Sequence, residues 1–167
     1  VSTSVGRGPG VTTTTRVRPN ATVVDLRVPT LQESSGEGFL LETREATGRL
    51  VVNGAEVEGE FRMPHLRLAD AGSSLTVSDQ VLSFRVRNRN DPFDAGRFDY
   101  GIDRFELVDQ HADVTLSGFV LAVEQTVAGT LLTSALDLRV ASLAVDGNEV
   151  KEVTASVTGE SLDRGLL

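Results

Sequence analysis

The sequence predicts an all-β protein built from antiparallel strands. Three observations lead to this class. Apolar and polar residues alternate with a period of two along most of the chain, and clusters of turn-forming residues separate these stretches. In addition, no long segment keeps the 3.6-residue apolar stripe of an amphipathic helix. We therefore expect roughly ten strands, joined mainly by hairpins, with little helix.

Two similar sequence segments predict the clearest hairpins, VVNGAEVEGEF at 51–61 and AVDGNEVKEVT at 144–154. Asn53-Gly54 and Asp146-Gly147 are dipeptides that favour the tight type I′ turn, so each is expected to reverse a strand. The residues that follow alternate between apolar and polar side chains, which predicts strands with one face in water. The repetition is compatible with two independent hairpins and with the duplication of one hairpin unit.

Further strands and turns follow from the same reasoning. One-sided strands are predicted where aliphatic or aromatic residues occupy every second position: Val24, Leu26 and Val28; Leu82, Phe84 and Val86; Leu136, Leu138 and Val140. Turns are predicted at the clusters PN from residue 19, ESSGEG from 33, DAGSS from 70 and RNDPFDAG from 89.

The apolar side of such a sheet has to be covered. Packing of two sheets as a sandwich ranks first, and closure into a barrel or a strongly curved, taco-like sheet are the alternatives. In the curved sheet, a groove would hold acyl chains or a partner. Only 5% of residues are aromatic and Trp is absent, so the covered surface is mainly aliphatic, which suits a lipid groove and an ordinary core equally.

The length of 167 residues and the apolar content of 40% favour one folded domain. We assign it to residues 11–167 and expect the Gly-, Ser- and Thr-rich residues 1–10 to form a flexible linker. The sequence has no apolar run of the length that a membrane-spanning helix needs. It begins with Val1, not Met, which leaves open a leader or membrane anchor outside this stretch.

Charge and cysteine content narrow the partners. The net charge of −8 and the pI of about 4.7 argue against a nucleic-acid partner, because such binding depends on clustered Lys and Arg. The absence of Cys excludes disulfides and thiolate metal sites, and it fits an envelope protein and a cytosolic protein equally.

No catalytic motif is present. His65 follows a proline at a strand junction and His111 lies in the polar turn DQHAD, and neither belongs to a metal-binding or nucleophile motif. Glu58 and Glu60 could act as an acid and base pair, but they belong to the water-facing side of a regular strand. We therefore expect a protein that is not an enzyme and that holds no cofactor and no metal.

The acidic stretch 90–103 is the strongest candidate for an exception. Its oxygen ligands suit calcium: Asn90, Asp91, Asp94, Asp99 and Asp103. The spacing does not match an EF-hand loop, however, and the alternation of aromatic or aliphatic residues from 98 to 102 favours a strand with a solvated acidic face. Calcium binding stays open.

The C-terminal third carries a family resemblance. Residues 116–167, LSGFVLAVEQTVAGTLLTSALDLRVASLAVDGNEVKEVTASVTGESLDRGLL, have strands of small and aliphatic residues that lead into LAVDGNEVKEVTASVTGESLDRGLL. This pattern of apolar residues resembles the repeated β-units of the YdgA-like bacterial envelope proteins of unknown function, and more loosely the AsmA-like proteins. The resemblance implies a membrane-anchored protein facing the periplasm, without known catalysis, with a curved sheet that contacts lipid or other envelope proteins.

Two functional hypotheses follow. The first is a noncatalytic exported or cell-envelope protein, periplasmic or at the cell surface, that binds a lipid or a protein partner along an apolar sheet face. Its predicted binding residues are Leu116, Val120, Leu136, Leu138 and Val140. The alternative is a structural or adhesive surface module in which the same residues form the closed core of a sandwich. The oligomeric state is left open.

Overall fold

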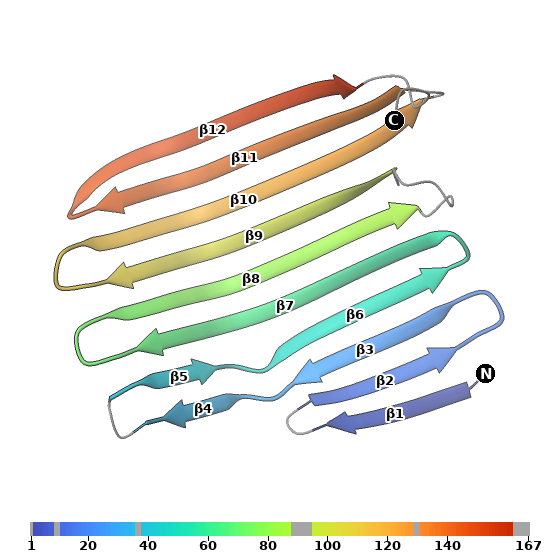
Figure 1. The fold of residues 1–167 in the computed structure, drawn as a ribbon, viewed down its shortest axis with the longest axis horizontal. Coiled ribbons are helices and arrows are strands. Elements are labelled where there is room, and N and C mark those ends of the chain that lie inside the picture. Colours follow the sequence, from blue (N-terminus) through green and yellow to red (C-terminus); the bar gives the residue numbers. More distant parts are fainter. Residues whose placement is uncertain (1, 9–10, 36–37, 88–94, 129–130, 162–167) are drawn as a thin grey trace.

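The computed structural model describes residues 2–8, 11–35, 38–87, 95–128 and 131–161. These residues form twelve strands and no helix, and all the strands belong to one antiparallel sheet (Figure 1). The prediction of an all-β antiparallel fold is confirmed, with two more strands than the rough estimate of ten. The part of the chain that the structure describes contains no helix that could span a membrane.

The first half of the chain supplies mostly short strands. Their bounds are β1 Ser2–Gly8, β2 Val11–Val17, β3 Thr22–Val28, β4 Leu31–Ser34, β5 Leu40–Thr43 and β6 Ala46–Asn53. The second half supplies long strands: β7 Glu56–Ala69, β8 Ser74–Arg87, β9 Ala95–Val108, β10 Asp113–Ala128, β11 Leu131–Val145 and β12 Asn148–Ser161. Residues 2–8, which we expected in a flexible linker, pair with β2 as strand β1.

Neighbouring strands in the sheet are almost always neighbours in sequence. The order is β1-β2-β3-β6-β7-β8-β9-β10-β11-β12, and the β4–β5 hairpin lies to the side, with β5 paired to the second half of β7. Hairpins therefore account for most of the topology. β1 and β12 form the two lateral edges of the sheet (Figure 1).

The two predicted hairpin turns differ in detail. Asp146 and Gly147 link β11 to β12, and both have positive φ (50° and 80°), as a type I′ turn requires. In the other hairpin, Asn53 pairs with Glu56, so the central turn residues are Gly54 and Ala55. Only Gly54 has positive φ there (58°), which is typical of a type II′ turn. The reversal was predicted correctly, but its centre lies one residue later than expected.

The sheet forms a single layer. A compact protein of 17.8 kDa exposes about 8,000 Å². This chain exposes 11097 Å², about 3,000 Å² more. No second sheet packs on either face within the described residues, so the sandwich that ranked first is not what the structure has, and the sheet is open.

The described residues contain hardly any core. Only five hydrophobic side chains among them are buried, namely Val23, Ala46, Val77, Leu132 and Val140. None of the large side chains described is fully buried, and many Val, Leu and Phe side chains are exposed by more than a third. Burial of apolar surface is the main driving force for folding, and the described sheet buries little of its apolar surface.

A row of irregular residues crosses the six long strands, and we call it the phase-shift row. Its members lie opposite one another on β7 to β12: Pro64, Asp79, Asp103, Gly118, Ala141 and Glu152. In each of the five pairs of neighbouring strands, the two residues of the row that lie opposite each other are not paired in the β-ladder. The register of the pairing is the same before and after the row. Asp79, Gly118 and Glu152 have positive φ (48°, 59° and 55°).

At this row, the apolar residues of each strand change from odd-numbered to even-numbered positions or the reverse, which we call a change of parity. Along β7, the partly buried positions run from Val57 through Phe61 to His65 at odd numbers, and then continue at Leu66 and Leu68. The same change of parity occurs in the sequence of β8 to β12; on β12, for example, Val150 is followed by Val153. A bulge-like residue takes one position per strand out of the alternation, so the apolar side chains on both sides of the row can share one face of the sheet.

Candidate functional site

The candidate site is the uncovered apolar face of the long strands. Residues that pair across antiparallel strands point to the same side, so the register assigns each side chain to a face. On the side of the row where β7 begins and β12 ends, the face carries Val57, Phe61, Met63, Leu82, Phe84, Val86, Phe98, Tyr100, Ile102, Phe119, Leu121, Val123, Leu136, Leu138, Val140, Val153, Ala155 and Val157.

Beyond the phase-shift row, a second and mainly aliphatic block lies on one face of the sheet, and the change of parity at the row leads us to assign it to the same face as the first. This block carries Leu66, Leu68, Leu75, Val77, Phe105, Leu107, Val114, Leu116, Leu143, Val145 and Val150. The strands are 14 to 16 residues long. At about 3.3 Å per residue, the apolar residues of one strand, such as Val57 to Leu68 on β7, span roughly 30–35 Å.

Three of the five predicted binding residues lie together on this face. Leu136, Leu138 and Val140 occupy alternate positions of β11, and Leu138 pairs with Leu121 of β10. Leu136 is 38% exposed, whereas Val140 is buried. Leu116 lies beyond the row, in register with Phe105 and Leu143. The structure thus assigns four of the five residues to the two apolar blocks.

Val120 lies apart from the other four. It pairs with Arg139 on β11 and with Gly101 on β9, so it belongs to the charged face, where it is 43% exposed. It is next to Phe119 and Leu121 in an unbroken apolar run, which hides the alternation in the sequence. Its structural neighbours do not group it with Leu136, Leu138 and Val140.

One polar pair sits within the apolar face and was missed at the sequence level. The Tyr100 hydroxyl donates a hydrogen bond to Gln80 Oε1 (3.0 Å), and the Tyr100 ring meets Phe119 edge to face at 6.3 Å between centroids. The Gln80 Nε2 atom is buried and has no hydrogen-bond partner. An unpaired buried donor of this kind is destabilising unless something else satisfies it. The sequence signal was a lone Gln between the apolar residues of β8.

The opposite face carries a lattice of charges. Arg85 Nη2 donates to Glu58 Oε2 across β7 and β8 (2.8 Å), and Arg87 pairs with Glu56 in the same way (2.9 Å). Other pairs join residues two apart on one strand, such as Arg97 with Asp99. All these side chains are at least one third exposed, so each pair stabilises the sheet only weakly.

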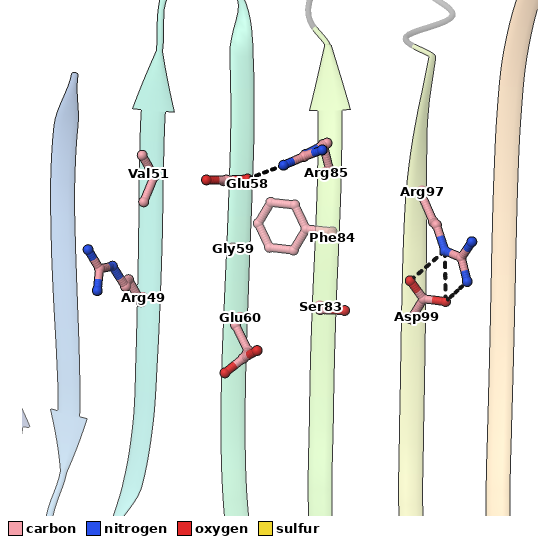
Figure 2. Close-up of a pocket in the computed structure, with 10 residues that line it drawn as sticks. All are labelled: Arg49, Val51, Glu58, Gly59, Glu60, Ser83, Phe84, Arg85, Arg97 and Asp99. Carbon is pink, nitrogen blue, oxygen red and sulfur yellow. Dashed lines mark hydrogen bonds and ion pairs between the residues drawn. The ribbon is translucent and has the colours of Figure 1, made fainter. Parts of the chain in front are cut away.

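The largest hollow that we describe lies over this lattice. It has a volume of about 550 Å³, and it is lined mainly by charged residues of β6 to β9 (Figure 2). Figure 2 shows Arg85 bonded to Glu58, Arg97 bonded to Asp99, and the Phe84 ring beside Gly59. A side chain at Gly59 would collide with that ring, because an added Cβ would lie 2.6 Å from Phe84.

The carboxylates of Asp99 and Glu60, which line the hollow, accept hydrogen bonds from arginine side chains. The hydrogen bond from Arg97 lowers the pKa of the Asp99 carboxyl below its ordinary value, and the hydrogen bond from Arg62 does the same for Glu60. General acid catalysis near neutral pH needs the opposite shift, toward a raised carboxyl pKa. These acids are therefore poor candidates for catalysis.

The remaining polar candidates do not assemble into a site. In the part of the chain that the structure describes, no three His, Asp or Glu side chains gather as a metal site would require. Of the proposed calcium ligands, Asp99 is bound to Arg97, Asp103 lies in the phase-shift row, and Asn90, Asp91 and Asp94 lie outside the described residues. His65 and His111 lie on different elements, one in β7 and one in the loop after β9.

Comparison with known proteins identifies the family. Residues 4–167 match the family described as "Bacterial protein of unknown function (DUF945)", and the chain belongs to it. The family match covers almost the whole chain, so a likeness confined to the C-terminal third was too narrow. Searches of the curated proteins and of the solved structures found no match.

Proposed function

We propose that this DUF945 protein is a noncatalytic exported or cell-envelope protein whose apolar sheet face holds the acyl chains of lipids. The observation that carries the proposal is the surplus of about 3,000 Å² of exposed surface over a compact protein of the same mass. Soluble monomers seldom leave apolar patches larger than several hundred Å² uncovered, and larger ones usually mark interaction sites.

The chemistry of the face suits hydrocarbon chains. Its side chains are mainly Val, Leu and Phe, and Gln80 and Tyr100 are among its few polar groups. Acyl chains offer no hydrogen bonds, so a face with few polar atoms can bind them without leaving groups unsatisfied. An apolar face roughly 30–35 Å long is comparable with the full hydrocarbon core of a bilayer, about 30 Å, and therefore has room for the full length of an acyl chain.

The envelope location rests on a separate argument. It draws on the likeness of residues 116–167 to the YdgA-like envelope proteins of unknown function, which implies a membrane-anchored protein that faces the periplasm. A structural sandwich module, the alternative from the sequence, has no support in the described sheet, because that module requires a closed core.

A pair of matched variants tests the assignment of the face. Leu136→Glu places a charge on the apolar face. Val120→Glu places the same charge on the charged face of the neighbouring strand β10, three positions from Val123, which pairs with Leu136. The two residues are similarly exposed (38% and 43%). We expect Leu136→Glu to weaken binding of a fluorescent C16 fatty acid at least tenfold, because the carboxylate has to be desolvated by the chain. Val120→Glu is expected to bind as the wild type does.

The outcome that contradicts the proposal is equally clear. If both variants bind the fatty acid as tightly as the wild type, or if neither the wild type nor Val120→Glu binds it, acyl chains do not occupy this face. Circular dichroism of each variant checks that the sheet is intact before binding is compared.

A further inference from the structure

A polar pair, Gln80 and Tyr100, interrupts the apolar face near its middle. Gln80 lies halfway along β8, next to the phase-shift row, and is in register with Met63 on β7 and Ile102 on β9. The Tyr100 ring packs edge to face against Phe119. These three neighbours are apolar, so their side chains offer the pair no strong hydrogen bond.

The pair has more hydrogen-bond donors than it can use internally. The Tyr100 hydroxyl donates to Gln80 Oε1 at 3.0 Å, and the N–H groups on Gln80 Nε2 are shielded from solvent without an acceptor. If the amide were turned end for end, Nε2 would donate to the Tyr100 oxygen, but the Tyr100 O–H and the second N–H would then lack an acceptor. In both orientations the pair is unfavourable unless an occupant of the face supplies an acceptor.

The chemistry around the pair favours an uncharged acceptor. A carboxylate or a phosphate at Gln80 would have to give up its hydration among apolar side chains, which costs far more than burying a carbonyl group. An acyl ester has a neutral carbonyl oxygen at one end of a long hydrocarbon chain. It therefore matches a polar pair that is set within an apolar surface.

The apolar face extends far enough from the pair to hold one acyl chain. Val86, near the end of β8, is six residues from Gln80, or about 20 Å along the strand. An acyl chain in one leaflet of a bilayer spans about half of the 30 Å hydrocarbon core, roughly 15 Å. A chain whose carbonyl lies at Gln80 can therefore remain on the apolar face, over exposed side chains such as Phe98 and Leu136.

We propose that the Gln80–Tyr100 pair binds the carbonyl oxygen of an acyl ester, with the acyl chain on the apolar face toward Val86. The Gln80 amide donates to the carbonyl, and the Tyr100 hydroxyl occupies Gln80 Oε1 so that the N–H groups remain available. This inference rests on the proposed function, and it adds a polar group that distinguishes esterified lipids from other long-chain molecules.

Two lysophospholipids that differ only in the linkage of the chain test this assignment. Hexadecanoyl lysophosphatidylcholine has an ester carbonyl, and hexadecyl lysophosphatidylcholine has an ether in its place. Native mass spectrometry of the protein with an equimolar mixture of the two measures their competition directly, because the two complexes differ in mass. We expect the ester lipid to occupy the wild type about tenfold more than the ether lipid, which corresponds to about 1.4 kcal/mol.

Three variants locate the source of this preference. Gln80→Leu removes the donor, so the ratio of ester to ether lipid should fall to about one or below. The double variant Gln80→Leu, Tyr100→Phe removes every polar side-chain atom of the pair, so it gives the same readout even where Gln80→Leu alone is unstable. Gln125→Leu is the matched control, because Gln125 is in register with Gly96 in the same row as Val86, at the end of the face; the ratio should stay at about ten.

The outcomes separate this inference from the proposed function. If the wild type binds both lipids equally, or if Gln80→Leu keeps the tenfold preference, the pair does not bind the carbonyl, while binding of acyl chains by the face stands. If the wild type binds neither lipid, the proposed function fails and the inference fails with it.

Discussion

Gly118 offers the sharpest test of the phase-shift row. It lies in the row on β10 with a φ of 59°, and an added Cβ would lie 2.7 Å from the Cβ of Ala141 on β11. We expect Gly118→Ala to destabilise the protein for two reasons, the left-handed backbone and the collision. The backbone contributes about 1–2 kcal/mol.

The collision adds to this cost. Ordinary contacts of a Cβ lie at 3.4–4 Å, and Ala141 Cβ is fixed to a paired strand, so β10 and β11 would have to separate locally. Overpacking of this kind costs about 1 kcal/mol or more. The total of roughly 2–3 kcal/mol corresponds to a fall in Tm of about 5–10 °C for a chain of this size.

Thermal and urea unfolding followed by circular dichroism measure this difference. The control is Gly101→Ala, where φ is not positive and the nearest atom to the added Cβ is a backbone oxygen at 3.7 Å; we expect a change of less than about 0.5 kcal/mol there. Adding Ala141→Gly to Gly118→Ala should relieve the collision but not the backbone strain. If Gly118→Ala is as stable as Gly101→Ala, the row does not have the conformation described.

Two further predictions concern polar groups on the two faces. Tyr100→Phe alone should destabilise the protein by about 1 kcal/mol, because it leaves both Oε1 and Nε2 of Gln80 without a hydrogen-bond partner. The double variant Tyr100→Phe, Gln80→Leu should be at least as stable as the wild type in urea unfolding. A double variant less stable than both single variants would refute this account. The pKa values of Asp99 and Glu60 are lowered in the folded state, so the stabilisation from their arginine partners is present at neutral pH and is lost as the pH falls through those lowered values, below the ordinary 3.8 and 4.5. Unfolding from pH 6 to pH 2.5 should therefore show a smaller loss of stability for Asp99→Asn with Glu60→Gln than for the wild type, and parallel curves would contradict it.

Much of the fold could be predicted from the sequence because its signals are local. The period of two and the Asp146-Gly147 turn report directly on strand and hairpin geometry, and both predictions are confirmed. The turn at Gly54 was placed one residue early because Asn-Gly favours a type I′ turn, whereas the pairing of Asn53 with Glu56 makes Gly54 the first central residue.

The packing could not be predicted in the same way. Alternation shows that a strand has an apolar side, but a sandwich, a barrel and an open sheet produce the same alternation. The face of Val120 was hidden because the run from Phe119 to Val123 is apolar at every position. The phase-shift row did leave a signal, since Val150 and Val153 on β12 have opposite parity, but it is visible only when several strands are aligned in register.

The central claim is that the apolar face is occupied by lipid when the protein is in contact with membranes. The most direct measurement is native mass spectrometry of protein purified from cells together with their membranes, followed by organic extraction and mass spectrometry of the extract. The account predicts acyl-chain lipids at near-stoichiometric amounts on the wild type and on Val120→Glu, and a large loss on Leu136→Glu. Protein that is free of lipid in all three forms would contradict it.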